Sequence, residues 1–148
     1  ARVVFCGEYE IAYEDTWERH QDLVNQYREQ LIFLGLKNDM QYMADFYAAC
    51  DVLALTSDSE CFALVQVEAM LSGTPVVMTN TPGGRVPVRE TGMGKLAEVG
   101  DWQSIGQALV DVIRERERYV KRREEIEAVF SFQQTVDQYE AVFRQYAR

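Results

Sequence analysis

The sequence predicts an α/β fold in which a Rossmann-like parallel sheet carries helices on both faces. Three observations lead to this class. Short apolar runs typical of buried parallel strands alternate with segments of helical periodicity. Glycine, proline and polar turn residues separate these segments. The 148 residues are enough for a substantial core, so we expect a single domain over residues 1–148.

The elements follow one another in a regular order. Apolar runs predict strands at residues 2–6, 31–34, 52–56, 75–79 and 95–99. Periodic apolar positions predict helices at residues 16–30, from Asn38 to about Cys50, at residues 62–71, after Asp101 and after Ser131. Residues 80–94 are rich in glycine and proline and predict a loop. The alternating charges of residues 114–125 predict a solvated helical face.

The segment from residue 52 to residue 79 organises the rest of the chain. It predicts a strand, a polar turn at residues 57–60, a helix and a second strand, which together form one βαβ unit. Gly73 suits the end of the helix, and Pro75 cannot continue it. In such sheets ligands bind beyond the carboxyl ends of the strands. We therefore expect a ligand near the start of this helix.

Two carboxylates interrupt this apolar unit. Glu60 lies in the turn, and Glu68 lies inside a helix that is otherwise largely apolar. A buried, unpaired carboxylate is costly, so Glu68 needs water, a partner or a ligand. The helix N-terminus lies between Glu60 and Glu68, and it favours an anion. At a rise of about 1.5 Å per residue, the two glutamates are roughly 9–12 Å apart. The alternative is an ordinary carboxylate at the helix start, with Glu68 on a solvent-facing edge beside Ser72.

Composition excludes several classes of partner. The net charge of −9 and the pI of about 4.6 argue against nucleic acid and against an anionic membrane surface. The three cysteines have no paired spacing, and one histidine is too few to form a metal cluster with them. A reduced, cytoplasmic protein is the reading that these residues favour. No apolar run reaches transmembrane length, so membrane association is not indicated.

Residues 57–77 read Ser-Asp-Ser-Glu-Cys-Phe-Ala-Leu-Val-Gln-Val-Glu-Ala-Met-Leu-Ser-Gly-Thr-Pro-Val-Val. This segment resembles the E-x7-E motif of retaining glycosyltransferases with the GT-B fold, enzymes of the glycogen-synthase and phosphatidylinositol-mannosyltransferase kind. The resemblance extends along nearly the whole chain. Its other parts are residues 32–35, residues 47–55, the glycine pair within residues 80–84, and residues 130–146.

The resemblance implies that the chain is the nucleotide-sugar-binding, C-terminal half of a transferase of the hexosyltransferase class. Glu60 would be catalytic and would accept hydrogen bonds from the donor sugar. Glu68 would accept hydrogen bonds from the ribose hydroxyls. The backbone N–H groups that would bind the diphosphate belong to Cys61, Phe62, Ala63 and Leu64. We expect no metal and no other cofactor, because the family uses helix dipoles and cations for the phosphates.

The chain also departs from the family pattern. The family often has glycine at the positions of Cys61 and Ala63. Its C-terminal half begins with one more strand and a loop with Arg and Lys, which have no counterpart before Arg2. We expect the acceptor-binding N-terminal domain to be missing and the chain alone to be inactive. The strands at residues 2–6 and 52–56 should then either pair directly or be separated by a gap.

Three alternatives remain at this stage. A nucleotide-sugar epimerase of GT-B fold would share the fold and the carboxylates. A non-catalytic relative would only regulate or scaffold. A flavodoxin-like interaction domain would not need Glu68 in an apolar helix. The sequence leaves open the base, the sugar, the acceptor, the oligomeric state, and whether Arg85 or Arg89 contacts phosphate.

Overall fold

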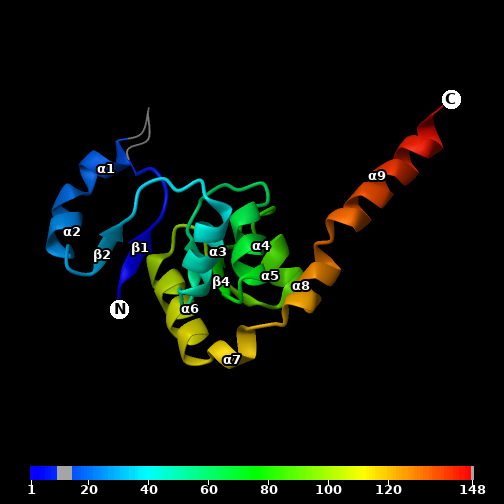
Figure 1. Ribbon diagram of the computed structural model, residues 1–148. Coiled ribbons are helices and arrows are strands. Elements are labelled where there is room, and N and C mark those ends of the chain that lie inside the picture. Colours follow the sequence, from blue (N-terminus) through cyan, green and yellow to red (C-terminus); the bar gives the residue numbers. More distant parts are fainter. Residues whose placement is uncertain (10–14, 148) are drawn as a thin grey trace. The chain divides into compact units, whose positions relative to one another are not determined.

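The computed structural model describes residues 1–9 and 15–147, and the chain divides into two compact units, Ala1–Met43 and Ala44–Arg148. Each unit contains a parallel sheet with helices beside it, which confirms the predicted α/β class (Figure 1). The first sheet has the strand order β1-β2, and the second has the order β3-β4-β5. Within the described residues no ladder joins β1 to β3, so the direct pairing of these strands, one of the two expected outcomes, is not observed.

In the first unit, β1 (Val3–Phe5) pairs in parallel with β2 (Leu31–Phe33). The predicted helix over residues 16–30 is instead two short helices, α1 (Thr16–Arg19) and α2 (Gln21–Gln26). His20 lies between them, and its Nδ1 is 2.7 Å from the carbonyl oxygen of Thr16. In a continuous helix that carbonyl would accept from the backbone N–H of His20, so the side chain competes with the helix at this point.

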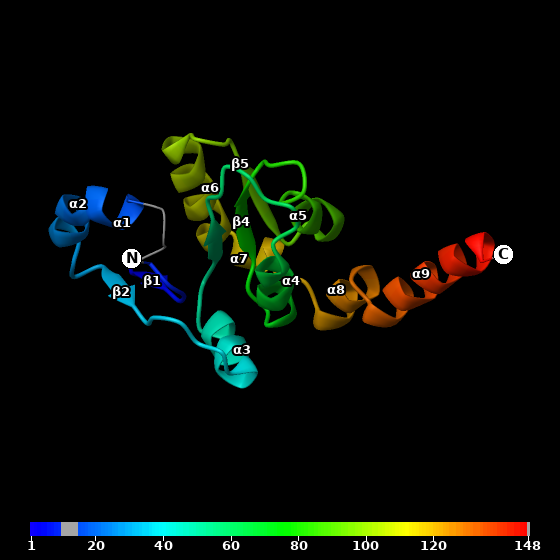
Figure 2. The same cartoon turned by 90° about the horizontal axis from the view of Figure 1, so that it is seen from above.

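The sheet of the second unit is built around a buried central strand. β4 (Val76–Thr79) is buried along its whole length and pairs in parallel with β3 (Leu53–Leu55) and β5 (Gly94–Ala97). Both views show α6 (Trp102–Arg114) on one side of this sheet, with α4 (Leu64–Leu71) and α5 (Val86–Thr91) on the other (Figures 1 and 2). This arrangement confirms helices on both faces of a parallel sheet.

The face of the sheet toward α6 forms one part of the core. Val77 of β4 and Ala97 of β5 pack in a buried cluster with Ala108 and Val112 of α6. Gly94 allows β4 and β5 to pair, because a Cβ at that position would lie 1.9 Å from the carbonyl oxygen of Val76. The apolar runs of β4 and β5 therefore supply core residues, whereas β3, which was expected to be buried, is only partly buried and exposes Ala54.

One predicted loop contains a helix. Within residues 80–94, a turn at residues 82–85 leads into α5, and the N-cap Arg85 is followed by Pro87 inside the first turn of the helix. Proline fits the first turn of a helix because its missing N–H would have no helical partner there. Glycine at both ends of this segment concealed a helix of only six residues from sequence analysis. α4 also begins at Leu64, two residues later than predicted.

The remaining helices are α3 (Met40–Ala48), α7 (Arg116–Tyr119), α8 (Arg123–Val129) and α9 (Phe132–Tyr146). The helices expected after Asp101 and Ser131 are confirmed: Asp101 caps α6 by accepting from the N–H groups of Gln103 and Ser104, and Ser131 caps α9 by accepting from the N–H of Gln134. Asp15 precedes α1 but makes no side-chain cap hydrogen bond. The charged segment is largely exposed, as predicted, but two of its arginines have a further role. Arg116 donates to the carbonyl of Gly73 and Arg123 to that of Leu71, at the C-terminal end of α4. Positive charges at the C-terminal end of a helix interact favourably with its dipole.

Candidate functional site

The turn between β3 and α4 lies at the carboxyl edge of the second sheet. Because β3 and β4 run parallel, both strands end at this edge. The buried hydroxyl of Thr79, the last residue of β4, donates to the carbonyl of Ser57 at the start of the turn. The end of one strand therefore fixes the start of the turn that follows its neighbour.

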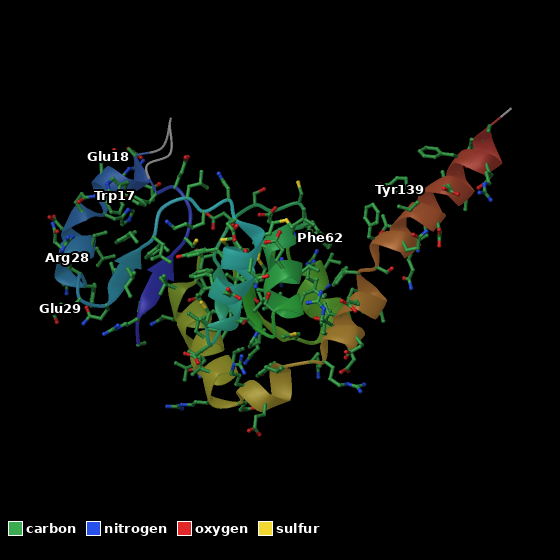
Figure 3. The ribbon with its side chains drawn as sticks, viewed as in Figure 1. Trp17, Glu18, Arg28, Glu29, Phe62 and Tyr139 are labelled. Carbon is green, nitrogen blue, oxygen red and sulfur yellow. The ribbon has the colours of Figure 1, made fainter. Side chains whose placement is uncertain are left out.

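Glu60 is half-buried in this turn, and its carboxylate binds the backbone that follows it. Oε1 accepts from the N–H of Cys61 at 2.8 Å and from the N–H of Phe62 at 3.4 Å. Cys61 is exposed, and the Phe62 ring, labelled in Figure 3, packs edge-on against Phe130 with 5.7 Å between the ring centroids. The turn thus presents N–H donors to an anion, and the anion present is the carboxylate of Glu60 itself.

Ala63 is the N-cap of α4 and has an unusual backbone conformation. Its φ of 56° and ψ of 79° are left-handed, and it is the one non-glycine with positive φ among residues 1–9 and 15–147. An alanine side chain has no acceptor for the first N–H groups of a helix, whereas Ser, Thr, Asp and Asn do. The start of α4 therefore receives no side-chain cap from its N-cap residue.

The glycine pair of the loop after β4 packs directly on this turn. A Cβ at Gly83 would lie 1.7 Å from the carbonyl oxygen of Cys61, and one at Gly84 would lie 3.3 Å from the Cβ of Glu60. These glycines bring the backbone of the loop close to the turn that carries Glu60. Arg85 follows them, and its Nη1 donates to Oδ1 of Asn80 at 3.3 Å.

Glu68 lies on the second turn of α4 with an exposed side chain. The hydroxyl of Tyr47, a residue of α3 that is 4% exposed, donates to its Oε2 at 3.0 Å. Ser72, the residue named with Glu68 in the solvent-edge alternative, donates its hydroxyl to the backbone carbonyl of Glu68. Glu68 therefore has both solvent access and a buried hydrogen-bond partner.

Sequence reasoning missed two residues of this site. Tyr47 lies in a helix that was expected from its apolar periodicity, and nothing in that local pattern predicts a polar contact for its hydroxyl. Gln66 is a polar residue in the same apolar helix as Glu68, and it is completely buried. Like Glu68, Gln66 is a polar side chain among apolar neighbours, so the sequence does carry a signal for it.

The first unit carries a separate cavity of about 350 Å³ at the carboxyl ends of β1 and β2. Its lining residues are Gly7, Glu8, Tyr9, Gly35 and Leu36. Across the described parts of the chain, His, Cys, Asp and Glu form no group of three or more that could hold a metal ion. Of the helices that the structure describes, none is long and apolar enough to cross a membrane.

Comparison with known proteins gives consistent matches. The family model described as "Glycosyl transferases group 1" matches residues 1–129. D-inositol 3-phosphate glycosyltransferase from Mycolicibacterium smegmatis is 33% identical over 93% of this chain and 31% of its own length. Phosphatidyl-myo-inositol mannosyltransferase from Mycobacterium leprae is 37% identical over 62% of this chain and 25% of its own length.

Solved structures agree with this assignment. Sucrose-phosphate synthase from Thermosynechococcus elongatus matches with a TM-score of 0.77 at 26% identity, over 96% of this chain and 37% of that one. HepE from Anabaena, solved in complex with UDP-glucose, matches with a TM-score of 0.72 at 25% identity, over 86% of this chain and 35% of that one. The chain thus spans between 25% and 37% of the length of these four proteins. Because the family model matches most of the chain and the fold is that of GT-B glycosyltransferases, the chain belongs to the Glycosyl transferases group 1 family.

Proposed function

We propose that this chain is the donor-binding part of a retaining glycosyltransferase of the E-x7-E type. The whole enzyme transfers a sugar from a nucleotide-sugar to an acceptor held by an N-terminal domain. In that reaction the bond between the anomeric carbon and the diphosphate oxygen breaks. The acceptor oxygen forms the new bond and loses its proton, and the nucleoside diphosphate leaves with the electron pair.

One observation carries the proposal. At the carboxyl edge of the sheet, the N–H groups of Cys61 and Phe62 converge on a carboxylate oxygen of Glu60. N–H groups that hold one anion in this way are suited to hold another, and the start of α4 adds its dipole. The HepE structures in complex with UDP and with UDP-glucose support a nucleotide-sugar as the ligand class for this family member.

The roles divide along the ligand. The N–H groups of Cys61, Phe62, Ala63 and Leu64 bind the diphosphate. Glu60 leaves these donors when the diphosphate arrives and accepts from hydroxyls of the donor sugar. Glu68, held by Tyr47, accepts from the ribose hydroxyls. Donor binding is therefore an exchange of anions at the turn, in which Glu60 is displaced from the N–H groups by phosphate oxygens.

Calorimetry with UDP, GDP, ADP and UDP-glucose tests the proposal. We expect at least one nucleoside diphosphate to bind, with backbone N–H resonances of Cys61 and Phe62 shifting when it is added. Absence of binding by all four ligands would contradict the proposal and favour a non-catalytic relative. EDTA should leave the dissociation constant unchanged, since we propose binding without a divalent metal. The 148-residue chain alone should transfer no sugar, because positioning of both substrates supplies much of such a rate.

A further inference from the structure

Gln66 is a completely buried polar residue on α4, one helical turn after the proposed diphosphate site. We propose that Gln66 is a positioning residue of the donor site, whose carboxamide locks the turn at residues 60–63 to the loop that carries Gly84. This inference rests on the proposed function of the same site. It concerns the orientation of the N–H donors and not a contact between Gln66 and the ligand.

The carboxamide joins two segments that are distant in the sequence. Its Nε2 donates to the carbonyl of Phe62 at 3.0 Å and to the carbonyl of Gly84 at 2.8 Å. Phe62 belongs to the turn and Gly84 to the loop after β4. The absence of a Cβ at Gly83 and Gly84 lets the two backbones approach closely enough for one amide group to reach both. Gln66 thus bonds both backbones at the point where the glycines permit contact.

The hydrogen bond to Phe62 determines where the next N–H points. A peptide unit is planar and trans, so the carbonyl of Phe62 and the N–H of Ala63 point in opposite directions. Because Gln66 draws the Phe62 carbonyl toward the buried side, the Ala63 N–H is directed away from Gln66. Ala63 has the left-handed backbone that L-residues rarely adopt, and such a conformation persists only where its surroundings hold it. The Gln66 bond to the peptide just before Ala63 supplies that restraint.

The amide is an unusual choice for a purely structural position. Among the described residues, Gln66 Oε1 is a buried side-chain atom without a hydrogen-bond partner, as is Thr81 Oγ1. A buried polar atom without a partner destabilises the fold, whereas an apolar side chain would leave none. Gln66 therefore donates two hydrogen bonds through Nε2 while its Oε1 has no partner. The destabilisation from Oε1 is explained if Gln66 orients the turn and does not only fill space in the core.

The test compares three variants by calorimetry with UDP, at a temperature where circular dichroism shows each to be folded. Gln66→Met keeps the length of the side chain and removes the donors, so we expect UDP to bind about tenfold more weakly. Gln107→Met is the matched control: it removes a glutamine that donates to Asp111 on the exposed face of α6 and should leave UDP affinity unchanged. A role in folding alone would lower stability without changing the affinity of the folded protein.

Gln66→Glu adds a pH dependence that packing would not give. A buried glutamate among carbonyl groups has a raised pKa, and only its protonated form can donate a hydrogen bond. The ratio of variant to wild-type dissociation constants, compared at each pH, should therefore fall as the pH is lowered from 8 toward 5. A ratio that does not change with pH would contradict the proposal.

Nuclear magnetic resonance of the wild type provides a test that needs no folded variant. The Ala63 N–H should shift strongly on addition of UDP, while the side-chain NH₂ of Gln66 stays protected from exchange. UDP binding without a shift at Ala63, or with equal affinity in Gln66→Met, overturns this inference and leaves the proposed function intact. A wild-type chain that binds none of the nucleotides overturns the proposed function and this inference with it.

Discussion

The hydroxyl of Tyr47 donates a hydrogen bond to Oε2 of Glu68 across 3.0 Å, from a buried residue to an exposed one. The Tyr47 backbone is itself fixed, because its carbonyl accepts from the buried hydroxyl of Thr74 at 2.6 Å. A flexible, exposed glutamate is thus held at one oxygen by a rigid donor. The other carboxylate oxygen of Glu68, Oε1, is then the one that would accept from a ribose hydroxyl in the proposed donor complex.

Tyr47→Phe should weaken UDP binding about threefold to tenfold, the expected effect of losing one hydrogen bond that orients Glu68. Calorimetry with UDP measures this effect, and Tyr139→Phe on exposed α9, labelled in Figure 3, is the control that should show none. In a Glu68→Ala background the Tyr47→Phe change should have no further effect on affinity. Equal losses in both backgrounds would show that Tyr47 acts by another route.

Ala63→Gly should stabilise the protein. Ala63 has φ of 56°, a left-handed conformation that costs an L-residue about 1–2 kcal/mol and glycine very little. The larger flexibility of glycine in the unfolded chain offsets part of this, so we expect a net gain of about 0.5–1 kcal/mol in urea denaturation. Ala128→Gly, at an exposed position of α8, should instead lose about 1 kcal/mol. A loss of stability in Ala63→Gly would contradict the conformational argument.

The sequence predicted the fold better than it predicted the contacts of the site. Apolar runs mark strands such as β4 because a strand buried on both faces must be apolar throughout. Periodic apolar positions predicted the helices after Asp101 and Ser131, whose starts depend on neighbouring residues alone. The prediction of one continuous helix over residues 16–30 was wrong at His20, where the side chain competes for a helical carbonyl. A periodic pattern of apolar residues contains no information about such a contact.

The site required long-range information that periodicity does not hold. Glu60 and Glu68 stood out because carboxylates interrupt an apolar segment. The residues that contact the site from a distance did not stand out. Tyr47 donates to Glu68 from another helix, 21 residues earlier in the chain, and Gln66 donates to Gly84, 18 residues later. Pairings over such separations follow from the packing of the sheet and its helices. The resemblance to a family supplied roles for the carboxylates, but it gave no role to Gln66.

The Lys95–Asp111 pair should make stability depend on pH at the acid end. Nζ of Lys95 on β5 lies 2.6 Å from Oδ2 of Asp111 on α6, and hydrogen bonds from Lys95 and then Gln107 lower the pKa of Asp111. A carboxyl with a lowered folded-state pKa stabilises the fold above its unfolded pKa, about 3.9, and loses that contribution as the pH falls through the lower folded value.

Asp111→Asn should therefore have a lower urea midpoint than the wild type at pH 7, and the difference should shrink as the pH is lowered from about 5 to 2. The pKa of Lys95 is raised chiefly by its hydrogen bond to Asp111, so the Lys contribution disappears only at strongly alkaline pH. In a Lys95→Met background the pH dependence of the Asp111→Asn effect should be much smaller. A difference that stays constant across the acid range would assign the effect of Asp111 to packing.

The two carboxylates of the site should have opposite effects on the bare diphosphate. Glu68 is proposed to contact ribose, which UDP and UDP-glucose share, so Glu68→Ala should weaken both ligands. A hydrogen bond to a charged group contributes roughly 1.5–3 kcal/mol, which is about 10- to 100-fold in affinity. Glu60 is proposed to contact the sugar, so Glu60→Ala should weaken UDP-glucose by a similar factor.

For UDP the structure predicts that Glu60→Ala is neutral or beneficial. The carboxylate of Glu60 accepts from the N–H groups of Cys61 and Phe62, so its removal frees both donors for phosphate and takes away one negative charge beside them. Calorimetry of both variants with both ligands measures the four affinities, and Glu124→Ala, at an exposed position of α8, is the control. Circular dichroism must first show that each variant is folded. Equal loss of both ligands in both variants, or unchanged UDP binding in Glu68→Ala, would show that these roles are assigned incorrectly.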